Sequence, residues 1–204
     1  MKNIVITIGR EYGSGGKYIG EEVAKRLNIA FYDKELLHKI YEENGCNYSL
    51  LEAYDEQTKN SFLKALGFIY TDNPESAFTE EKYYELVRET IQKIASFESC
   101  VLLGRNTNQI LKDQKNVLHF FIYAKDEEFK IQGKMKIENL SYDEAKEKMY
   151  KVDKMRKKYY ETFNKSHWGD KYDYDFCIDS SKLGIEKTID LIVDIVKRFM
   201  EGQN

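Results

Sequence analysis

The sequence predicts a three-layer α/β fold, in which a parallel sheet lies between helices on both faces. Short runs rich in β-branched and aromatic residues alternate with longer amphipathic stretches along the chain. This alternation is typical of β–α crossovers in a parallel sheet. Three of the short runs are almost continuously apolar, as strands covered on both faces usually are.

Each element follows from the periodicity of its apolar residues. Strands are expected at residues 4–8, 100–103, 117–123 and 174–178, with a weaker candidate at 29–32. The first helix is expected to begin near Gly16, a second to cover residues 86–94, and the last to end before Gly202.

Length and composition limit the class of protein. The 204 residues, of which 42% are hydrophobic and 14% aromatic, fit one domain with a substantial core. A net charge of -3 argues against general binding to nucleic acid or anionic membranes. No apolar run approaches the roughly 20 residues that span a bilayer, and residues 1–8 read as a strand, not a signal peptide. Cys46, Cys100 and Cys177 form no CxxC pair, so we expect reduced thiols and a cytoplasmic protein.

The first predicted strand leads into a glycine-rich loop, Gly13-Ser14-Gly15-Gly16-Lys17. A strand, a glycine loop and a helix N-terminus in succession direct backbone N–H groups toward a phosphate. The loop departs from the pattern G-x-x-x-x-G-K-[ST], because Glu11 stands five residues before Gly16 and Tyr18 follows Lys17. A tight turn with spare glycines is the alternative, but three glycines in four positions exceed what a turn requires.

Several segments together resemble the cytidylate kinase-like family, a branch of the phosphate-loop nucleoside monophosphate kinases. They are residues 10–17, residues 31–35, Gly104-Arg105, Lys165-Ser166-His167-Trp168-Gly169-Asp170, Tyr174-Asp175 and Ser181-Lys182-Leu183-Gly184. The resemblance covers most of the chain except about residues 41–80. It implies a central sheet of about five strands, a helical lid that closes over ATP, and transfer of the γ-phosphoryl group to a nucleoside monophosphate, CMP or dCMP first.

The resemblance also implies one domain over residues 1–204. A helical acceptor-side insertion is expected at about 34–98 and a lid region at about 126–166. ATP and Mg²⁺ are the expected cofactors, with the metal held mainly through phosphates, so no residue is predicted as a metal ligand. Nucleotide substrates are the expected partners, without nucleic acid or a membrane. The sequence leaves the oligomeric state open.

For the donor site, the resemblance points to six consecutive residues: Gly13, Ser14, Gly15, Gly16, Lys17 and Tyr18. Cytidylate kinases read Gly-Ser-Gly-Lys-Gly-Thr here, so Gly16 stands in the place of their phosphate-clamping lysine. Lys17 is displaced by one residue, which turns its side chain by about 100° around a helix. We expect its long flexible stem to bring positive charge to the phosphates as a catalytic group.

Arg105 and Asp33 are the residues predicted to bind the acceptor. Arg105 follows a predicted strand, and ligands of open α/β sheets bind beyond the carboxyl ends of strands. Its guanidinium can hold a monophosphate bidentately. Asp33 resembles the aspartate near the acceptor nucleoside in cytidylate kinases, and an N-cap of the following helix is the alternative. Asn106 stands where those enzymes have an aspartate.

Residues 146–158 contain seven basic and two acidic side chains. This segment, with Asp153 and Arg156, resembles the lid of the family, and Arg156 is predicted to contact phosphate as a catalytic residue. Cations that close over the phosphates are what phosphoryl transfer requires. A solvated helix face is the alternative.

Two other functions stay open. One is a non-catalytic nucleotide-binding or regulatory protein that keeps the phosphate-binding loop without the clamp. The other is a small-molecule kinase with a non-nucleotide acceptor, because a fold does not fix a substrate. His38, His119 and His167 show no metal-ligand spacing. His119 lies in an apolar strand and is expected to be a hydrogen-bonded core residue.

Overall fold

The computed structural model describes residues 3–33 and 80–202. The chain divides into two compact units, Met1–Tyr32 with Ala95–Asn204, and Asp33–Ile94. Of the second unit, the described parts are Asp33 and most of helix α5 (Glu80–Phe97). Cys46 and His38 lie outside the described residues, and so does the helix that Asp33 is predicted to cap.

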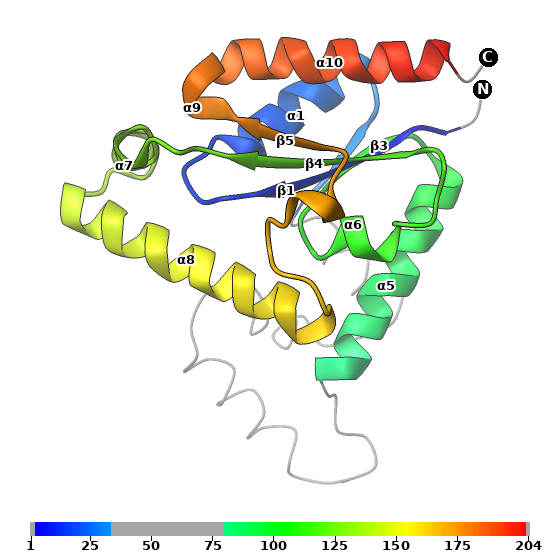
Figure 1. Cartoon of the computed structure of the whole chain (residues 1–204), viewed down its shortest axis with the longest axis horizontal. Coiled ribbons are helices and arrows are strands. Elements are labelled where there is room, and N and C mark those ends of the chain that lie inside the picture. The colour runs from blue at the N-terminus through cyan, green and yellow to red at the C-terminus, as the bar shows by residue number, and fades with distance from the viewer. Residues whose placement is uncertain (1–2, 34–79, 203–204) are drawn as a thin grey trace, which may run out of the picture. The chain divides into compact units, whose positions relative to one another are not determined.

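A five-stranded parallel sheet forms the first unit's centre (Figure 1). Its strands lie in the order β2-β3-β1-β4-β5, and each neighbouring pair is parallel. Their bounds are β1 (Val5–Arg10), β2 (Ala30–Tyr32), β3 (Cys100–Leu103), β4 (Val117–Tyr123) and β5 (Phe176–Asp179). The predicted parallel α/β fold is confirmed, and all five predicted strands are present.

Two strand ends differ from the prediction. β1 continues through Gly9 to Arg10, because these residues pair with Phe121 and Ile122 of β4. β5 begins at Phe176 and not two residues earlier, because the chain before it forms the short 3₁₀ helix η2 (Lys171–Asp173). The first difference places Arg10 at the carboxyl edge of the sheet.

Helices α1 (Gly16–Leu27) and α10 (Ile185–Glu201) cover one face of the sheet, at the top of Figure 1. Both ends that the sequence predicts, the start near Gly16 and the stop before Gly202, are confirmed. Because successive strand side chains point to opposite faces, every second strand residue packs against these helices. The main core contains Ile6, Ile8, Val101, Leu103, Phe120 and Ile122 from the strands, Ile19 and Val23 from α1, and Ile189, Ile192 and Val196 from α10.

Helix α6 (Thr107–Ile110) lies on the opposite face of the sheet (Figure 1). His119 is 8% exposed, and its Nδ1 shares a 2.8 Å hydrogen bond with Thr7 Oγ1. Burial lowers the pKa of this imidazole, against the opposing effect of Asp175. His119 is therefore the core residue that the sequence predicts. Among the cysteines that the structure describes, Cys100 is buried, Cys177 is exposed, and neither forms a disulfide.

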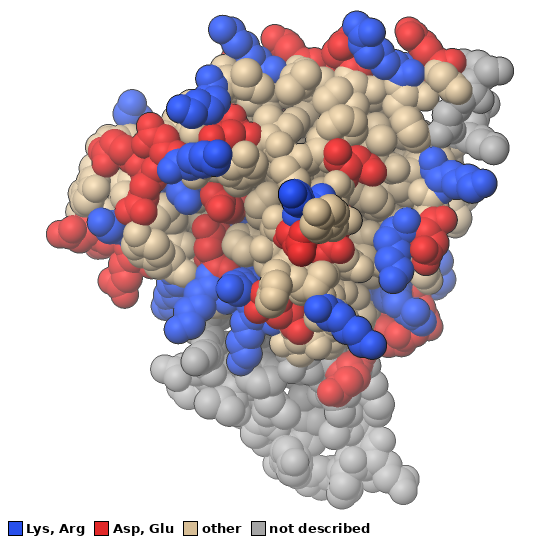
Figure 2. Space-filling model, viewed as in Figure 1, with Lys and Arg blue, Asp and Glu red and all other residues tan. Residues whose placement is uncertain are grey.

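The predicted lid region contains two helices, α7 (Glu127–Glu138) and α8 (Tyr142–Phe163), which we call the lid hairpin. Ser141 begins α8 with a capping box, in which its side chain accepts from the backbone N–H of Glu144 and the Glu144 carboxylate accepts from the backbone N–H of Ser141. Over the visible face, basic and acidic side chains are interspersed (Figure 2). Within residues 3–33 and 80–202, no helix has the length and apolar character needed to cross a membrane.

Candidate phosphate-binding site

The loop between β1 and α1 depends on glycine at two positions. Gly13 has φ 80° and Gly15 has φ 78°, a left-handed conformation that is costly for residues with a Cβ. Gly15 is also the N-cap of α1, and no side chain caps this helix end. The loop therefore presents backbone where most helices present a capping side chain.

The backbone N–H groups of this loop are largely available. Among the described residues, neither the Gly13 nor the Gly15 N–H has a hydrogen-bond acceptor. The Ser14 N–H reaches the Glu11 carbonyl at 3.5 Å, and the Gly16 N–H reaches Ser14 Oγ at 3.4 Å, both longer than ordinary hydrogen bonds. These amides stand at the N-terminus of a twelve-residue helix, where the dipole favours an anion. The arrangement is that of a phosphate-binding loop.

Side chains at the back of the loop fix its shape. Ser14 is fully buried, and its Oγ donates to the Glu11 carbonyl at 2.9 Å. The carbonyl of Ser14 accepts a 2.7 Å bond from Ser180 Oγ, the residue directly after β5 and the first of helix α9 (Ser180–Leu183). A Cβ on Gly13 would lie 2.7 Å from Lys130 Cβ and 2.9 Å from the Lys130 carbonyl. The loop is thus packed against α7 and tied to the start of α9.

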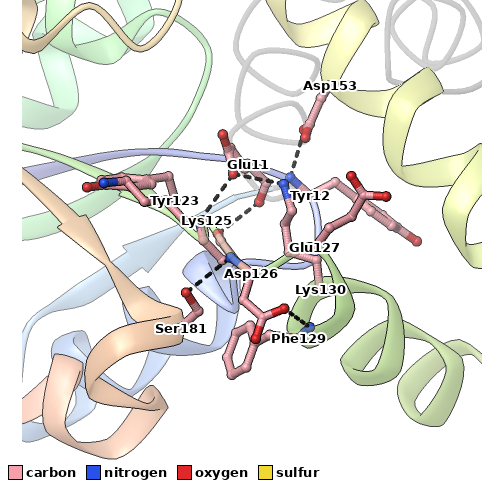
Figure 3. A network of polar contacts seen from close by, with 12 residues as sticks. Glu11, Tyr12, Tyr123, Lys125, Asp126, Glu127, Phe129, Lys130, Asp153 and Ser181 are labelled. Atoms are coloured by element: carbon pink, nitrogen blue, oxygen red, sulfur yellow. Dashed lines mark hydrogen bonds and ion pairs between the residues drawn. The ribbon is translucent and has the colours of Figure 1, made fainter.

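Glu11 links the loop to α7 and to the end of β4 (Figure 3). Its carboxylate accepts from Lys130 Nζ at 3.1 Å and from the backbone N–H of Ala124 at 3.2 Å. The Lys130 side chain is 13% exposed. Because Lys130 is paired with Glu11, most of its charge is compensated within the protein.

Tyr12 attaches the loop to both helices of the lid hairpin. Its side chain is 6% exposed and belongs to a small apolar cluster with Ile131, Ala145, Met149 and Val152. The Tyr12 hydroxyl donates to Glu138 of α7 at 2.7 Å. The backbone N–H of Tyr12 donates to Asp153 of α8, also at 2.7 Å (Figure 3).

The two carboxylates that bind Tyr12 have pKa values shifted in opposite directions. Burial alone would raise the pKa of Glu138, but hydrogen bonds from Lys134, Lys148 and Tyr12 outweigh it and lower this pKa to about 2. Burial raises the pKa of Asp153 to about 6, although the Tyr12 N–H and Arg156 act against it. Asp153 therefore takes up a proton as pH falls through about 6, while Glu138 stays ionised down to far lower pH.

Lys17 and Tyr18, both predicted for the donor site, lie on the exposed side of α1. The Lys17 ammonium is 3.8 Å from the Glu21 carboxylate one turn along the helix, and its side chain is 56% exposed. Tyr18 is 49% exposed. Both side chains are therefore largely exposed at the first turn of α1, next to the glycines of the loop in the chain.

Arg156, in contrast, lies at the start of the loop. Its side chain is 12% exposed, and its Nη1 donates to the Arg10 carbonyl at 3.2 Å and lies 3.7 Å from the Asp153 carboxylate. Two lysines of the same basic segment pair with α7 instead, Lys146 with Glu127 at 3.5 Å and Lys148 with Glu138 at 2.6 Å. The predicted basic face is therefore divided between the loop and the other lid helix.

The predicted acceptor residue Arg105 lies in a strained segment after β3. Gly104, Arg105 and Asn106 have φ values of 77°, 58° and 57°. For residues with a Cβ this conformation costs about 1–2 kcal/mol each, and such strain often accompanies functional sites. Asn106 is 5% exposed, and among the described residues its Nδ2 has no hydrogen-bond partner. Asp33 follows β2 directly and belongs to the second unit, so its position relative to Arg105 is not described.

The Trp-Gly-Asp segment of the resemblance packs against the sheet. The Trp168 ring meets Phe121 of β4 edge-on at 5.5 Å. A Cβ on Gly169, whose φ is 81°, would lie 3.1 Å from the same phenyl ring. Asp170 caps η2 by accepting from the Tyr172 N–H at 3.1 Å. In this structure the motif positions the chain between α8 and β5.

Ser180 and Arg10 are among the residues at the site that the sequence does not predict as site residues. Ser180 holds the loop carbonyl, and its signal in the sequence is its place two residues after a predicted strand. Arg10 follows the predicted first strand, at the start of the segment that resembles the family's loop. The continuation of β1 along β4 gives Arg10 a fixed place at the sheet edge.

A central parallel sheet, a glycine loop with available amides between β1 and α1, and a helical hairpin packed on that loop define a kinase-like phosphate-loop protein. The family model of the cytidylate kinase-like family matches residues 5–182. The chain belongs to this family, which confirms the resemblance found in the sequence.

Solved structures agree with the fold. An uncharacterized protein from Eubacterium ventriosum is 28% identical with a TM-score of 0.72, covering 96% of this chain and 99% of that one. A shikimate kinase from Bacteroides thetaiotaomicron has 15% identity and a TM-score of 0.52, covering 95% of this chain and 98% of its own. A shikimate kinase from Acinetobacter baumannii, in complex with shikimate, has 14% identity and a TM-score of 0.50, with coverage of 97% and 94%. No curated protein matches the sequence.

Proposed function

We propose that the protein transfers the γ-phosphoryl group of ATP to a nucleoside monophosphate, with CMP or dCMP as the preferred acceptor. The observation that carries the proposal is the pair of Gly13 and Gly15 N–H groups at the N-terminus of α1, for which the described residues supply no acceptor. Backbone amides in this arrangement bind the phosphates of a nucleotide. Membership of the cytidylate kinase-like family supports the choice of donor and acceptor.

The reaction requires positioning and charge neutralisation more than covalent chemistry. An oxygen of the acceptor phosphate forms a bond to the γ-phosphorus, and the bond from that phosphorus to the β–γ bridging oxygen breaks. The electron pair of the broken bond stays on the departing ADP. The loop of Gly13, Ser14, Gly15 and Gly16 would hold the donor phosphates.

Magnesium would arrive with ATP as part of the substrate complex. Within the described residues, no group of three or more His, Cys, Asp or Glu side chains is placed to hold a metal. Mg²⁺ commonly keeps several water ligands and takes the rest from phosphates and one or two carboxylates. When bound, it would reduce the negative charge on the phosphates.

The acceptor phosphate would be held by Arg105, with Asp33 near the nucleoside. The strain at Arg105 and the buried Nδ2 of Asn106 support a binding role for this segment. Arg156 would bring positive charge from the lid hairpin, since it already lies on the Arg10 carbonyl.

An acceptor panel tests the proposal. Purified protein with ATP and magnesium is given CMP, dCMP, UMP, AMP, GMP and non-nucleotide alcohols such as shikimate, and ADP formation is measured. We expect CMP or dCMP to give the fastest rate. If no acceptor raises ADP formation above that with ATP alone, phosphoryl transfer is wrong for this protein.

The same panel decides between the two alternatives. A response to a non-nucleotide alcohol alone would identify a small-molecule kinase, for which the shared fold with shikimate kinases gives a reason to include shikimate. ATP binding in calorimetry without turnover of any acceptor would identify a non-catalytic nucleotide-binding protein.

A further inference from the structure

The space beside Gly16 is occupied by Arg10. A Cβ on Gly16 would lie 2.5 Å from Arg10 Cβ and 3.1 Å from Arg10 Cγ. Real Cβ atoms do not approach other carbons to 2.5 Å, so a side chain at Gly16 and the observed Arg10 exclude each other. The glycine at position 16 therefore accommodates the stem of this arginine.

The two residues also occupy matched places in the phosphate-loop pattern G-x-x-x-x-G-K-[ST]. With Gly15 and Gly16 laid on its Gly-Lys pair, Arg10 falls on the first glycine. The chain thus has a glycine where the pattern has its cation, and a cation where the pattern has a glycine. Both changes together keep one long basic side chain at this point, starting from the strand instead of the helix.

The guanidinium of Arg10 extends from the loop toward β3. A Cβ on Gly104 would lie within 2.1 Å of Arg10 Nη1, so the guanidinium rests against the backbone at the end of that strand. Gly104 is joined to β1 by a 3.0 Å hydrogen bond from its N–H to the Ile8 carbonyl. The side chain therefore runs from the proposed donor loop to the segment proposed to hold the acceptor.

We propose that Arg10 is the catalytic cation of this site, taking the place of the phosphate-loop lysine and contacting the phosphoryl group that passes from donor to acceptor. This rests on the proposed function and names the residue that neutralises the transferred charge. A guanidinium suits the task, because it stays charged and binds phosphate oxygens bidentately.

The inference assigns to Arg10 the role that the sequence suggests for Lys17. The ammonium of Lys17 lies beside Glu21, one turn along α1. Substitution of each cation by methionine, which keeps most of the stem, separates the two. Arg198 pairs with Asp194 on the exposed side of α10, so Arg198→Met serves as the control for loss of a surface arginine.

We expect Arg10→Met to lower kcat/KM by about 10²–10³-fold, as loss of a group that stabilises transition-state charge does. ATP affinity in calorimetry should fall by about tenfold, and Arg10→Lys should recover part of both losses. Lys17→Met should cost less than a tenth of what Arg10→Met costs, and Arg198→Met should match the parent protein. Thermal melts of each variant show whether it is folded.

The exchange itself is tested by restoring the standard pattern. Gly16→Lys alone should weaken ATP binding, because the new Cβ meets Arg10. Arg10→Gly combined with Gly16→Lys removes this clash and should regain ATP affinity to within tenfold of the parent. A folded double variant that binds ATP no better than Arg10→Gly alone contradicts the exchange.

The outcomes separate this inference from the proposed function. If the parent protein neither binds ATP nor forms ADP, both fail. If the parent binds ATP and is active, while folded Arg10→Met stays within twofold of it in affinity and kcat/KM, only the role of Arg10 is wrong. A larger loss in Lys17→Met than in Arg10→Met would also overturn it.

Discussion

The two neighbouring strands β1 and β3 end at the same edge of the sheet, yet the chain leaves them in different ways. After β1, the positions with positive φ are Gly13 and Gly15. After β3, positive φ continues from Gly104 through Arg105 and Asn106. Glycine adopts this conformation without steric cost, while each residue with a Cβ loses about 1–2 kcal/mol. The first segment therefore offers backbone to a ligand, and the second keeps side chains despite the strain.

The two segments also differ in what holds them. The loop after β1 is fixed by the lid hairpin through Tyr12 and Glu11, and by Ser180, which directly follows β5. The segment after β3 contains a buried amide, Asn106 Nδ2, without a partner among the described residues. A site that binds through backbone needs a rigid frame, while one that binds through side chains can leave a polar group for the ligand.

The largest effect is expected from adding one methyl group to the loop. Gly13→Ala forces a Cβ to within 2.7 Å of Lys130 Cβ and 2.9 Å of its carbonyl, at φ 80°. Strain of about 1–2 kcal/mol and overpacking of about 1–3 kcal/mol together lower the free energy of unfolding by about 2–5 kcal/mol. Urea denaturation measures this loss, and ATP binding should weaken with it.

Gly133→Ala is the matched control, since nothing lies within 4 Å of the added Cβ. Gly133 is inside α7, where alanine is favoured over glycine by about 1 kcal/mol. The same chemical change should therefore stabilise the protein there. Equal stability of the parent and Gly13→Ala would show that the contact between the loop and α7 is not as tight as the structure has it.

A smaller effect, with a defined pH dependence, is expected at Asp153. Its pKa is raised from 3.8 to about 6 by burial, so the folded state binds the proton more tightly than the unfolded chain. The free energy of unfolding should fall, through this group, as pH rises from about 4 to 6, by roughly 2–3 kcal/mol. Asp153→Asn keeps an oxygen to accept from the Tyr12 N–H. It should be more stable than the parent at pH 8 and lack this slope.

Glu138, which also binds Tyr12, should make the free energy of unfolding depend on pH in the opposite direction. Its pKa of about 2 lies below the ordinary 4.5, so its ionised form stabilises the fold above about pH 4.5, and this is lost as pH falls toward 2. Glu138→Gln should be less stable than the parent at pH 7, with a difference that shrinks toward pH 2. Asp153→Asn and Glu138→Gln should therefore change the free energy of unfolding in opposite directions at pH 8. A change in the same direction would mean that burial at Asp153 and ion pairing at Glu138 do not account for the opposite pKa shifts.

The sequence predicts the sheet well, because continuous apolar runs mark buried parallel strands whatever their neighbours are. It also locates the glycine loop, since strand, glycines and helix are local in the chain. It places Lys17 near the phosphates from adjacency alone, whereas the helix turns this side chain toward Glu21. Local patterns determine where backbone can bind, and they do not determine where a side chain points.

Arg10 shows most clearly what cannot be predicted from the sequence. Its place depends on pairing with β4 and on glycines at positions 16 and 104, which are far apart in the chain. No periodicity links these three residues, so only the folded sheet brings them together. The attachment of Tyr12 to Asp153 likewise joins residues 141 positions apart.

The smallest expected effect tests the strain after β3 directly. Arg105→Ala and Arg105→Gly both remove the guanidinium, so the loss of its contacts is common to both, and the two differ only in the Cβ at φ 58°. The glycine variant should be more stable than the alanine variant by about 1 kcal/mol, a value reduced by the greater freedom of glycine in the unfolded chain. Urea denaturation of the pair measures it.

The KM for the acceptor should change equally in Arg105→Ala and Arg105→Gly, although their stabilities differ. If Arg105 binds the acceptor phosphate, both variants should raise the KM for CMP by at least tenfold, with little change in ATP affinity. A glycine variant that gains stability over the alanine variant and also keeps the parent KM would mean that the strain serves the fold and not the acceptor. An alanine variant more stable than the glycine variant would mean that the left-handed turn at Arg105 costs nothing, and the contrast between the two strand ends would then rest on Gly13 and Gly15 alone.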